Sequence, residues 1–279
     1  MKTWNKSAKN FFNENGYVII EDVLSANECD HIRTIVLKLA KWEKESNTAH
    51  VYDKDPSYLT SIDELKEDTN SSYLQRVWNL LSKHEVFPKI IQLPIILEIM
   101  NSVFDRDTKH QKYLLSSFQA NLIGAGGPEQ KLHVDIPVPE PLPTWMLKAN
   151  TIWPIDDFTE FNGATLCLPG SHKSKFKPTD LDQDRPDLVK LTAKKGSVII
   201  THGALWHKSG NNQTKNDRVA LLGSFAASFA KDISTEEDYM QVLNSNISSN
   251  FSMDLQKILG VGRGIQPGSL QKPPRWKIH

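Results

Sequence analysis

The segment YLLSSFQANLIG (113–124) begins a part of the chain that is rich in strand-like runs. It is a strand-like run rich in apolar residues, and similar short runs follow it, separated by Gly, Pro or Asn. These runs are KLHVDI (131–136), ANTIWPI (149–155), GATLCLPG (163–170), GSVIITHG (196–203) and RVALLGSF (218–225). Many short strands with turn residues between them are typical of an antiparallel sandwich or barrel. The sequence therefore predicts a mainly β core over roughly 113–230.

The regions that flank this core are predicted to be mostly helical. GYVIIEDV (16–23) has the β-branched residues of a short strand, and Ser25 followed by Glu28 forms a capping-box pattern that marks a helix start. Residues 76–104 have a helical pattern that prolines interrupt. The expected organisation is a single domain over 1–279, with helical N-terminal support (1–104), the β core (113–230) and a C-terminal tail (231–279).

Residues 44–75 differ from the segments on both sides because they are polar and contain few apolar side chains. A long surface loop is one interpretation of this stretch. The other is a lid over an active site, since long loops in compact domains are often functional. The sequence leaves both interpretations open.

Composition and charge argue against several classes of partner. The 279 residues are enough to bury a full core, and 33 Lys and Arg balance 33 Asp and Glu. A neutral chain does not favour nucleic acid as a partner. The N-terminus lacks the apolar core of a signal peptide and no apolar run could span a membrane, so we expect no membrane partner and a cytoplasmic location. Cys29 and Cys167 fit reduced, buried thiols, and the oligomeric state is left open.

The motif KLHVD (131–135) is the strongest sign of chemistry. His133 and Asp135 are one residue apart, so on a β-strand both side chains point to the same face and can reach one metal ion. His207 offers a third ligand, and Arg218 follows eleven residues after it. Two His and one carboxylate that leave open positions are the ligands of non-haem Fe(II) oxygenases. A nearby Arg can bind the carboxylate of a co-substrate through two parallel hydrogen bonds.

Four segments together resemble the phytanoyl-CoA dioxygenase family of Fe(II)/2-oxoglutarate-dependent oxygenases. They are FFNENGYVIIEDVLSANECDHIR (11–33), KLHVD (131–135), FNGATLCLPGSHK (161–173) and GSVIITHGALWHKSGNNQTKNDRVAL (196–221). The resemblance implies a mainly β fold with flanking helices, namely a double-stranded β-helix (jelly roll, cupin-like). It also implies Fe(II) and 2-oxoglutarate as cofactors and O2 as co-substrate.

The resemblance also implies roles for particular residues. His133 and Asp135 would be the first two iron ligands, and either His202 or His207 would be the third. The family's spacing between the distal His and the Arg matches His207 and Arg218, whereas His202 lies sixteen residues before that Arg. We therefore predict His207 as the third ligand and Arg218 as the partner of the far carboxylate of 2-oxoglutarate.

Further contacts are predicted on a looser alignment with the family. Four residues are candidates for binding 2-oxoglutarate, and ordinary strand or turn roles remain the alternative for each of them: Ser209, Asn121, Gln130 and Thr165. The segment IPVPEPLPTW (136–145) follows the metal motif, and its alternating prolines favour a stiff, extended path. Trp145 at its end is a candidate for lining a substrate pocket, because such pockets are mostly apolar and aromatic.

The expected function is that of an Fe(II)/2-oxoglutarate-dependent dioxygenase that oxidises, by hydroxylation, a small-molecule metabolite with release of succinate and CO2. Desaturation, cyclisation or endoperoxidation of a natural product on the same scaffold is an alternative. A jelly-roll domain that binds without turnover is another, and loss of a metal ligand or of the Arg would favour it. Neither is lost in this chain. Fold and cofactor do not determine the substrate.

Overall fold

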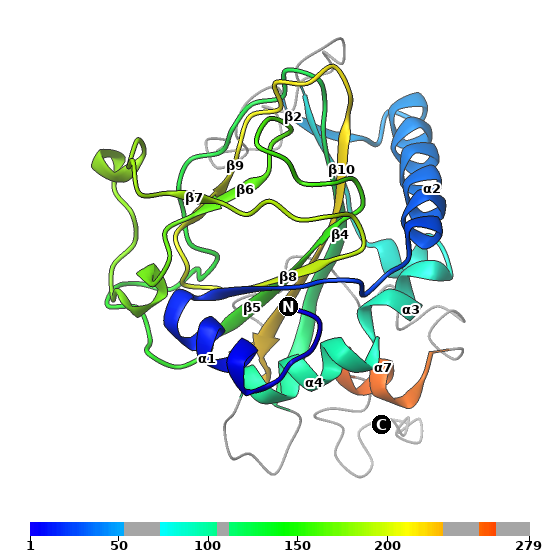
Figure 1. Cartoon of the computed structure of the whole chain (residues 1–279). Coiled ribbons are helices and arrows are strands. Elements are labelled where there is room, and N and C mark those ends of the chain that lie inside the picture. The colour runs from blue at the N-terminus through cyan, green and yellow to red at the C-terminus, as the bar shows by residue number, and fades with distance from the viewer. Residues whose placement is uncertain (53–72, 105–111, 231–250, 261–279) are drawn as a thin grey trace, which may run out of the picture.

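Two antiparallel sheets face each other at the centre of the molecule (Figure 1). The computed structural model of the chain describes residues 1–52, 73–104, 112–230 and 251–260. The larger sheet has the order β1 (Tyr17–Ile20), β8 (Val198–His202), β5 (Lys148–Pro154), β10 (Arg218–Ala227), β4 (Tyr113–Ile123), β3 (Leu74–Val77) and β2 (His50–Tyr52). The smaller sheet has the order β7 (Val189–Lys190), β6 (Thr165–Cys167) and β9 (His207–Ser209). This arrangement is the predicted double-stranded β-helix, mainly β with flanking helices.

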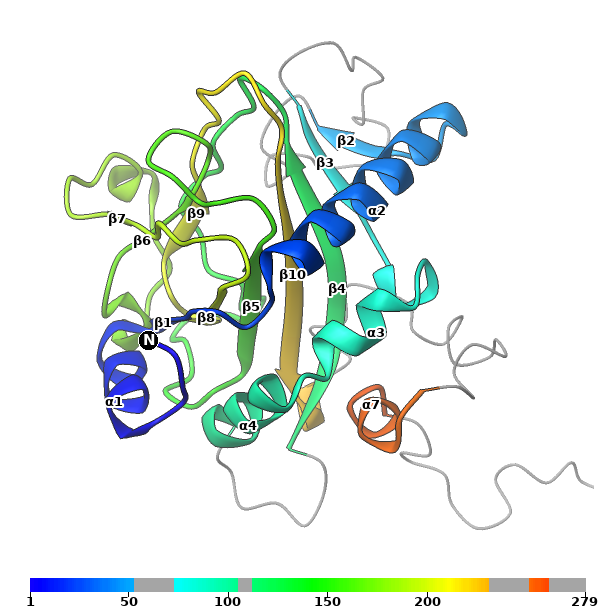
Figure 2. The ribbon, with the colours of Figure 1, turned by 45° about the vertical axis from the view of Figure 1, so that its right-hand side comes forward.

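Most of the helices cover the outer face of the large sheet, on the side away from the small sheet, whereas the helix nearest the N-terminus lies at the edge formed by β1 (Figure 2). The described helices are α1 (Lys6–Asn15), α2 (Ala26–Glu45), α3 (Val86–Ile91), α4 (Pro94–Val103) and α7 (Met253–Ile258). Short 3-10 turns lie between the elements: η3 (Leu80–Ser82), η4 (Ser171–Lys173), η5 (Asp180–Asp182) and η6 (Ser228–Ala230). None of the helices in the described parts of the chain is both long enough and apolar enough to cross a membrane.

The predicted capping box begins α2. The Ser25 hydroxyl accepts a hydrogen bond from the backbone N–H of Glu28, and the Glu28 carboxylate accepts one from the Ser25 N–H at 2.7 Å. These bonds satisfy backbone donors that the first turn of a helix otherwise leaves without partners. One face of α2 is buried against the large sheet, by residues that include Cys29, Ile32, Val36 and Ala40.

The large sheet has different chemistry on its two faces, and β4 shows this most clearly. Phe118 and Leu122 point outward into the main hydrophobic core, under the helices. Ser117, Gln119 and Asn121 alternate with them and are also buried, but they face the inside of the β-helix. Because successive side chains of a strand point to opposite faces, an entirely buried strand can have one apolar and one polar face. The inner polar face is where the cavity described below is located.

The N-terminal region contributes strands as well as helices. The sequence predicted a strand within 16–23, where β1 lies, but it did not predict β2 or β3 and extended a helical pattern over 76–104. β3 pairs with β4, and β2 pairs with β3, so this hairpin covers an edge of the large sheet. Most of the possible lid lies outside the described residues, as does the C-terminal tail apart from 251–260.

Candidate metal and co-substrate site

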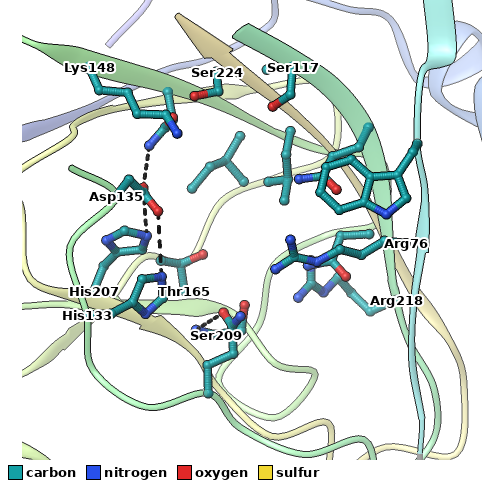
Figure 3. Close-up of a pocket in the computed structure, with 18 residues that line it drawn as sticks. Arg76, Ser117, His133, Asp135, Lys148, Thr165, His207, Ser209, Arg218 and Ser224 are labelled. Atoms are coloured by element: carbon teal, nitrogen blue, oxygen red, sulfur yellow. Dashed lines mark hydrogen bonds and ion pairs between the residues drawn. The ribbon is translucent and has the colours of Figure 1, made fainter. Parts of the chain in front are cut away.

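Three predicted ligands come together inside the β-helix (Figure 3). His133, Asp135 and His207 each offer a ligand atom, and these atoms all lie within 4.8 Å of one another. Nε2 of His133 is 3.6 Å from Oδ1 of Asp135, and Nε2 of His207 is 3.3 Å from Oδ2. The spacing leaves room for one ion between the three groups.

Backbone carbonyls hold both imidazole rings in the orientation that metal binding requires. Nδ1 of His133 lies 2.8 Å from the Lys131 carbonyl, and Nδ1 of His207 lies 2.9 Å from the Leu205 carbonyl. A carbonyl oxygen can only accept a hydrogen bond, so Nδ1 carries the hydrogen in each neutral ring and Nε2 presents a lone pair. Both lone pairs are directed toward the carboxylate of Asp135. Metal-binding histidines in proteins are oriented by this kind of contact, so the donor set fits a divalent ion.

Main-chain bonds fix the positions of the three side chains. The backbones of His133 and His207 exchange two hydrogen bonds of 3.0 Å, which join the metal motif to β9. The N–H of Asp135 donates to the carbonyl of Gly203 at 2.9 Å, and the N–H of Gly203 donates to the carbonyl of Lys148 at 2.7 Å. A Cβ on residue 203 would lie 2.7 Å from the Cβ of Lys148, so this close approach requires glycine.

The environment of Asp135 keeps its carboxyl ionised. Burial alone would raise the pKa of this group. The neighbouring His207, His133 and Lys148, together with a hydrogen bond from the Asn150 amide, outweigh that effect and place the pKa below its ordinary value. A carboxylate ligand is therefore available at neutral pH.

A cavity of about 490 Å³ opens beside the three ligands. Its lining includes every polar residue that the sequence nominated: His133, Asp135, His207, Arg218, Ser209, Asn121, Gln130 and Thr165. Trp145 is not part of this lining, and its ring packs against that of Phe229 with centroids 5.3 Å apart. The cavity wall is therefore more polar than the apolar and aromatic pocket expected around Trp145.

Arg218 is a buried cation on the cavity wall, only 3% exposed at the start of β10. One guanidinium nitrogen donates to the carbonyl of Gly163 at 2.9 Å, and the guanidinium lies 4.5 Å from the ring centroid of Phe158. Burial lowers the pKa of Arg218 to about 10, an effect partly opposed by the charge of Asp156, so the group stays charged at neutral pH. Its Nε has no hydrogen-bond partner among the described residues. A buried cation with an unused donor suits the carboxylate of a small molecule.

The remaining candidates line the same cavity. The side-chain oxygen of Gln130 accepts from the N–H of Ser209 at 3.1 Å, and Thr165 pairs with Ser209 between β6 and β9. The side-chain oxygen of Asn121 is buried and has no hydrogen-bond partner within the described chain. Asn121 therefore has unused hydrogen-bonding capacity next to the cavity.

Prediction from sequence missed about half of the lining. The additional residues are Arg76, Trp78, Ser117, Gln119, Lys148, Asn150, Ile152, Leu222, Gly223 and Ser224. A signal for several of them was available, because polar residues alternate with apolar ones at 117–122 inside a long strand-like run. Such alternation in a strand that is buried on both faces indicates an internal polar site.

His202, the alternative ligand, lies outside the metal group. Its Nδ1 accepts a hydrogen bond of 3.0 Å from the N–H of Ala204, and its ring packs 5.1 Å from that of His172. Burial, with a smaller contribution from His172, lowers the pKa of His202 to about 3. Its ring is therefore neutral, and it lies apart from the group formed by His133, Asp135 and His207.

The family model described as Phytanoyl-CoA dioxygenase (PhyH) matches residues 12–220, which include His133, Asp135, His207 and Arg218. The chain belongs to the phytanoyl-CoA dioxygenase family. It is thus an Fe(II)/2-oxoglutarate-dependent dioxygenase, with Fe(II), 2-oxoglutarate and O2 as its cofactors and co-substrate. The donor atoms of His133, Asp135 and His207 fit that assignment.

Curated relatives of the chain are named dioxygenases, and a solved structure shares its fold. Dioxygenase af480 of Aspergillus fumigatus is 33% identical over 153 residues, which are 53% of this chain and 48% of that protein. The Fe(II)/2-oxoglutarate-dependent dioxygenase nvfF of Aspergillus novofumigatus is 27% identical over 220 residues, or 75% of this chain and 68% of that protein. HygX from Streptomyces hygroscopicus, solved with nickel and 2-oxoglutarate bound, shares the fold with a TM-score of 0.62 at 15% identity, covering 81% of this chain and 88% of its own.

Proposed function

We propose that His133, Asp135 and His207 hold Fe(II), that Arg218 binds the far carboxylate of 2-oxoglutarate, and that the enzyme hydroxylates a small-molecule metabolite. The observation that supports this most strongly is the convergence of three ligand atoms within 4.8 Å beside a buried arginine in one cavity. Bound Fe(II) would supply the oxidative chemistry that converts 2-oxoglutarate to succinate and CO2 as the substrate is oxidised.

The protein side chains bind and orient the reactants. Two histidines and one carboxylate leave coordination positions for the co-substrate and O2. Arg218 is held by Gly163 and Phe158, so its guanidinium is already oriented before a carboxylate arrives. When Arg218 binds the far carboxylate of 2-oxoglutarate, the reacting end is oriented with little further loss of translational and rotational freedom. Because the cavity wall is buried, this ion pair forms where water screens it little.

A small molecule as the primary substrate is supported by the size of the cavity. Its 490 Å³ must accommodate 2-oxoglutarate as well as the substrate, and it falls within the usual range of small-molecule sites. HygX has also been solved with hygromycin B bound, and a structure of similar fold, SnoK, is described as a carbocyclase from nogalamycin biosynthesis. Ring formation is therefore known on this fold. Hydroxylation is proposed here as the simplest outcome, since the alternatives require additional control over where the substrate's C–H bonds lie.

Anaerobic titration tests the site, and succinate release tests the activity. Purified protein loaded with Fe(II) is expected to develop the metal-to-ligand absorption band when 2-oxoglutarate is added, and to release succinate once O2 is admitted. His207→Ala should abolish both signals, whereas His202→Ala should retain them. The reverse pattern would show that the third ligand is His202.

A further inference from the structure

The backbone alone does not determine which oxygen of Asp135 faces a metal ion. His207 belongs to β9 and His133 pairs with it across a β-bridge, so both imidazoles come from paired backbone. Asp135 lies two residues beyond that bridge and outside any strand, and its backbone N–H donates to the carbonyl of Gly203. The terminal torsion angle of an aspartate has broad energy wells, so a side-chain contact must orient this carboxylate.

Asn150 supplies that contact from the middle of the large sheet. Its Nδ2 donates a hydrogen bond of 2.5 Å to Oδ2 of Asp135. An ionised carboxylate can only accept hydrogen bonds, so the amide nitrogen is the atom that faces it. The backbone of Asn150 is paired on both sides, with Thr201 of β8 and with Ser224 of β10. A donor on an internal strand therefore anchors a carboxylate that comes from an irregular segment.

The two oxygens of Asp135 have different neighbours. Oδ2 accepts the Asn150 hydrogen bond and lies 3.3 Å from Nε2 of His207, whereas Oδ1 lies 3.6 Å from Nε2 of His133. Carboxylates that bind metals in proteins are themselves hydrogen-bonded, and this contact orients them. Because the amide engages Oδ2, Oδ1 is the oxygen left for a metal ion. Binding through one oxygen also preserves the open coordination positions of a site with two histidines and one carboxylate.

Lys148 acts on the same carboxylate, but in a different way. It lies two residues before Asn150 on β5, so both side chains point to the same face. Figure 3 shows Lys148 on the side of Asp135 away from the two imidazoles. Its influence on Asp135 is that of a charge, which depends on distance, whereas a hydrogen bond also depends on direction. The orientation of the carboxylate is therefore the contribution of Asn150.

We propose that Asn150 is a positioning residue of the metal site, whose amide binds Oδ2 of Asp135 so that Oδ1 alone is offered to the metal ion. This inference deepens the proposed function and rests on it, since it concerns the same ligand group. Asn150 acts through Asp135 rather than on the reactants. Without its amide, the carboxylate would be able to turn, or to bind through both oxygens and fill a position that the co-substrate or O2 requires.

The experiment measures Mn(II) affinity by electron paramagnetic resonance of the free ion, in the absence of 2-oxoglutarate. Asn150→Leu removes the donor with little change in side-chain volume, Asn150→Ala removes it without adding bulk, and Asn150→Gln keeps an amide. Asn121→Leu is the matched control, because it makes the same substitution on another strand of the same cavity wall. Without 2-oxoglutarate, the candidate role of Asn121 in binding that molecule does not affect the result. Thermal melting confirms that each variant is folded.

We expect Asn150→Leu and Asn150→Ala to weaken Mn(II) binding by roughly tenfold or more, the usual effect of removing a group that orients a metal ligand. Asn150→Gln should recover part of the affinity, and Asn121→Leu should leave it nearly unchanged. The visible absorption spectrum of the Co(II)-saturated protein is the second readout, because it reports the arrangement of the ligands. It should change in Asn150→Leu and stay the same in Asn121→Leu.

Unchanged Mn(II) affinity of folded Asn150 variants that lack the amide, an unchanged Co(II) spectrum of Asn150→Leu, or an equal loss of affinity in Asn121→Leu would each overturn the inference. A crystal structure of the wild type with Mn(II) bound to Oδ2 of Asp135 would do the same. These outcomes concern the inference alone, because the wild type would still bind the metal. A wild-type protein that binds neither Mn(II) nor Co(II) would overturn the proposed function as well.

Discussion

Replacing Arg218 by alanine is the perturbation whose effect follows most directly from the geometry. Arg218 is 3% exposed, and its Nε has no hydrogen-bond partner in the described structure. Removing one member of a buried, hydrogen-bonded charge pair typically costs about 2–5 kcal/mol. Since every 1.4 kcal/mol changes a dissociation constant tenfold, Arg218→Ala should weaken 2-oxoglutarate binding by roughly 30-fold or more. Fe(II) binding should change little, because Arg218 is not among the three ligand residues.

The assay is an anaerobic titration of the Fe(II)-loaded protein with 2-oxoglutarate, followed through the metal-to-ligand absorption band. Arg218→Ala also removes the donor to the Gly163 carbonyl, so thermal melting must confirm that each variant is folded. Arg33→Ala is the control, because Arg33 forms an ion pair of 2.8 Å with Asp156 but does not line the cavity. A dissociation constant of Arg218→Ala within about threefold of the wild type would refute the assignment.

Three further predictions test separate parts of the structure. Folding holds the pKa of the His202 imidazole near 3, below its ordinary value of 6.5, so the unfolded chain binds a proton more readily than the folded chain. The free energy of unfolding should therefore fall by about 1.4 kcal/mol per pH unit as the pH drops from 6.5 toward 3. His202→Asn keeps an acceptor for the Ala204 N–H, so it should mainly reduce this pH dependence of the unfolding free energy. Urea unfolding at several pH values measures the dependence, and an unchanged dependence would show that His202 does not cause it. Gly203→Ala should weaken Fe(II) binding by roughly tenfold or more, because its Cβ would clash with Lys148 beside Asp135, and equal metal affinity in a titration would count against this positioning role. Turnover with chloride or bromide present should yield no halogenated product by mass spectrometry, because Asp135 would occupy the metal position that a halide needs; detection of one would show that Asp135 does not bind the metal.

Much of the fold could be predicted because its strands are marked locally. The runs between 113 and 225 are bounded by Gly, Pro and Asn, and their β-branched and apolar content is typical of strands. The capping box at Ser25 and Glu28 likewise predicts where α2 begins. By contrast, β2 and β3 are short and exist because β3 pairs with β4, which is distant in sequence. Pairing of that kind leaves little local signal.

The metal ligands could be predicted for a similar reason. His133 and Asp135 share a face of one strand, so their spacing alone indicates a joint function. Arg76 and Lys148 have no such motif, and their place in the cavity depends on which strands become neighbours in the sheet. Trp145 was nominated from the usual aromatic character of pockets, whereas the described wall is built mainly from polar strand residues. The polar alternation at 117–122 is the part of the sequence that indicates this wall.

The most direct test of the central claim is a crystal structure of the protein prepared without oxygen, with Mn(II) and 2-oxoglutarate. One anomalous peak is expected between Nε2 of His133, an oxygen of Asp135 and Nε2 of His207, in direct coordination with all three. Density for 2-oxoglutarate should run from this peak to the guanidinium of Arg218. A peak beside His202 would show that His207 is not the third ligand, and co-substrate density that does not reach Arg218 would show that Arg218 is not its partner.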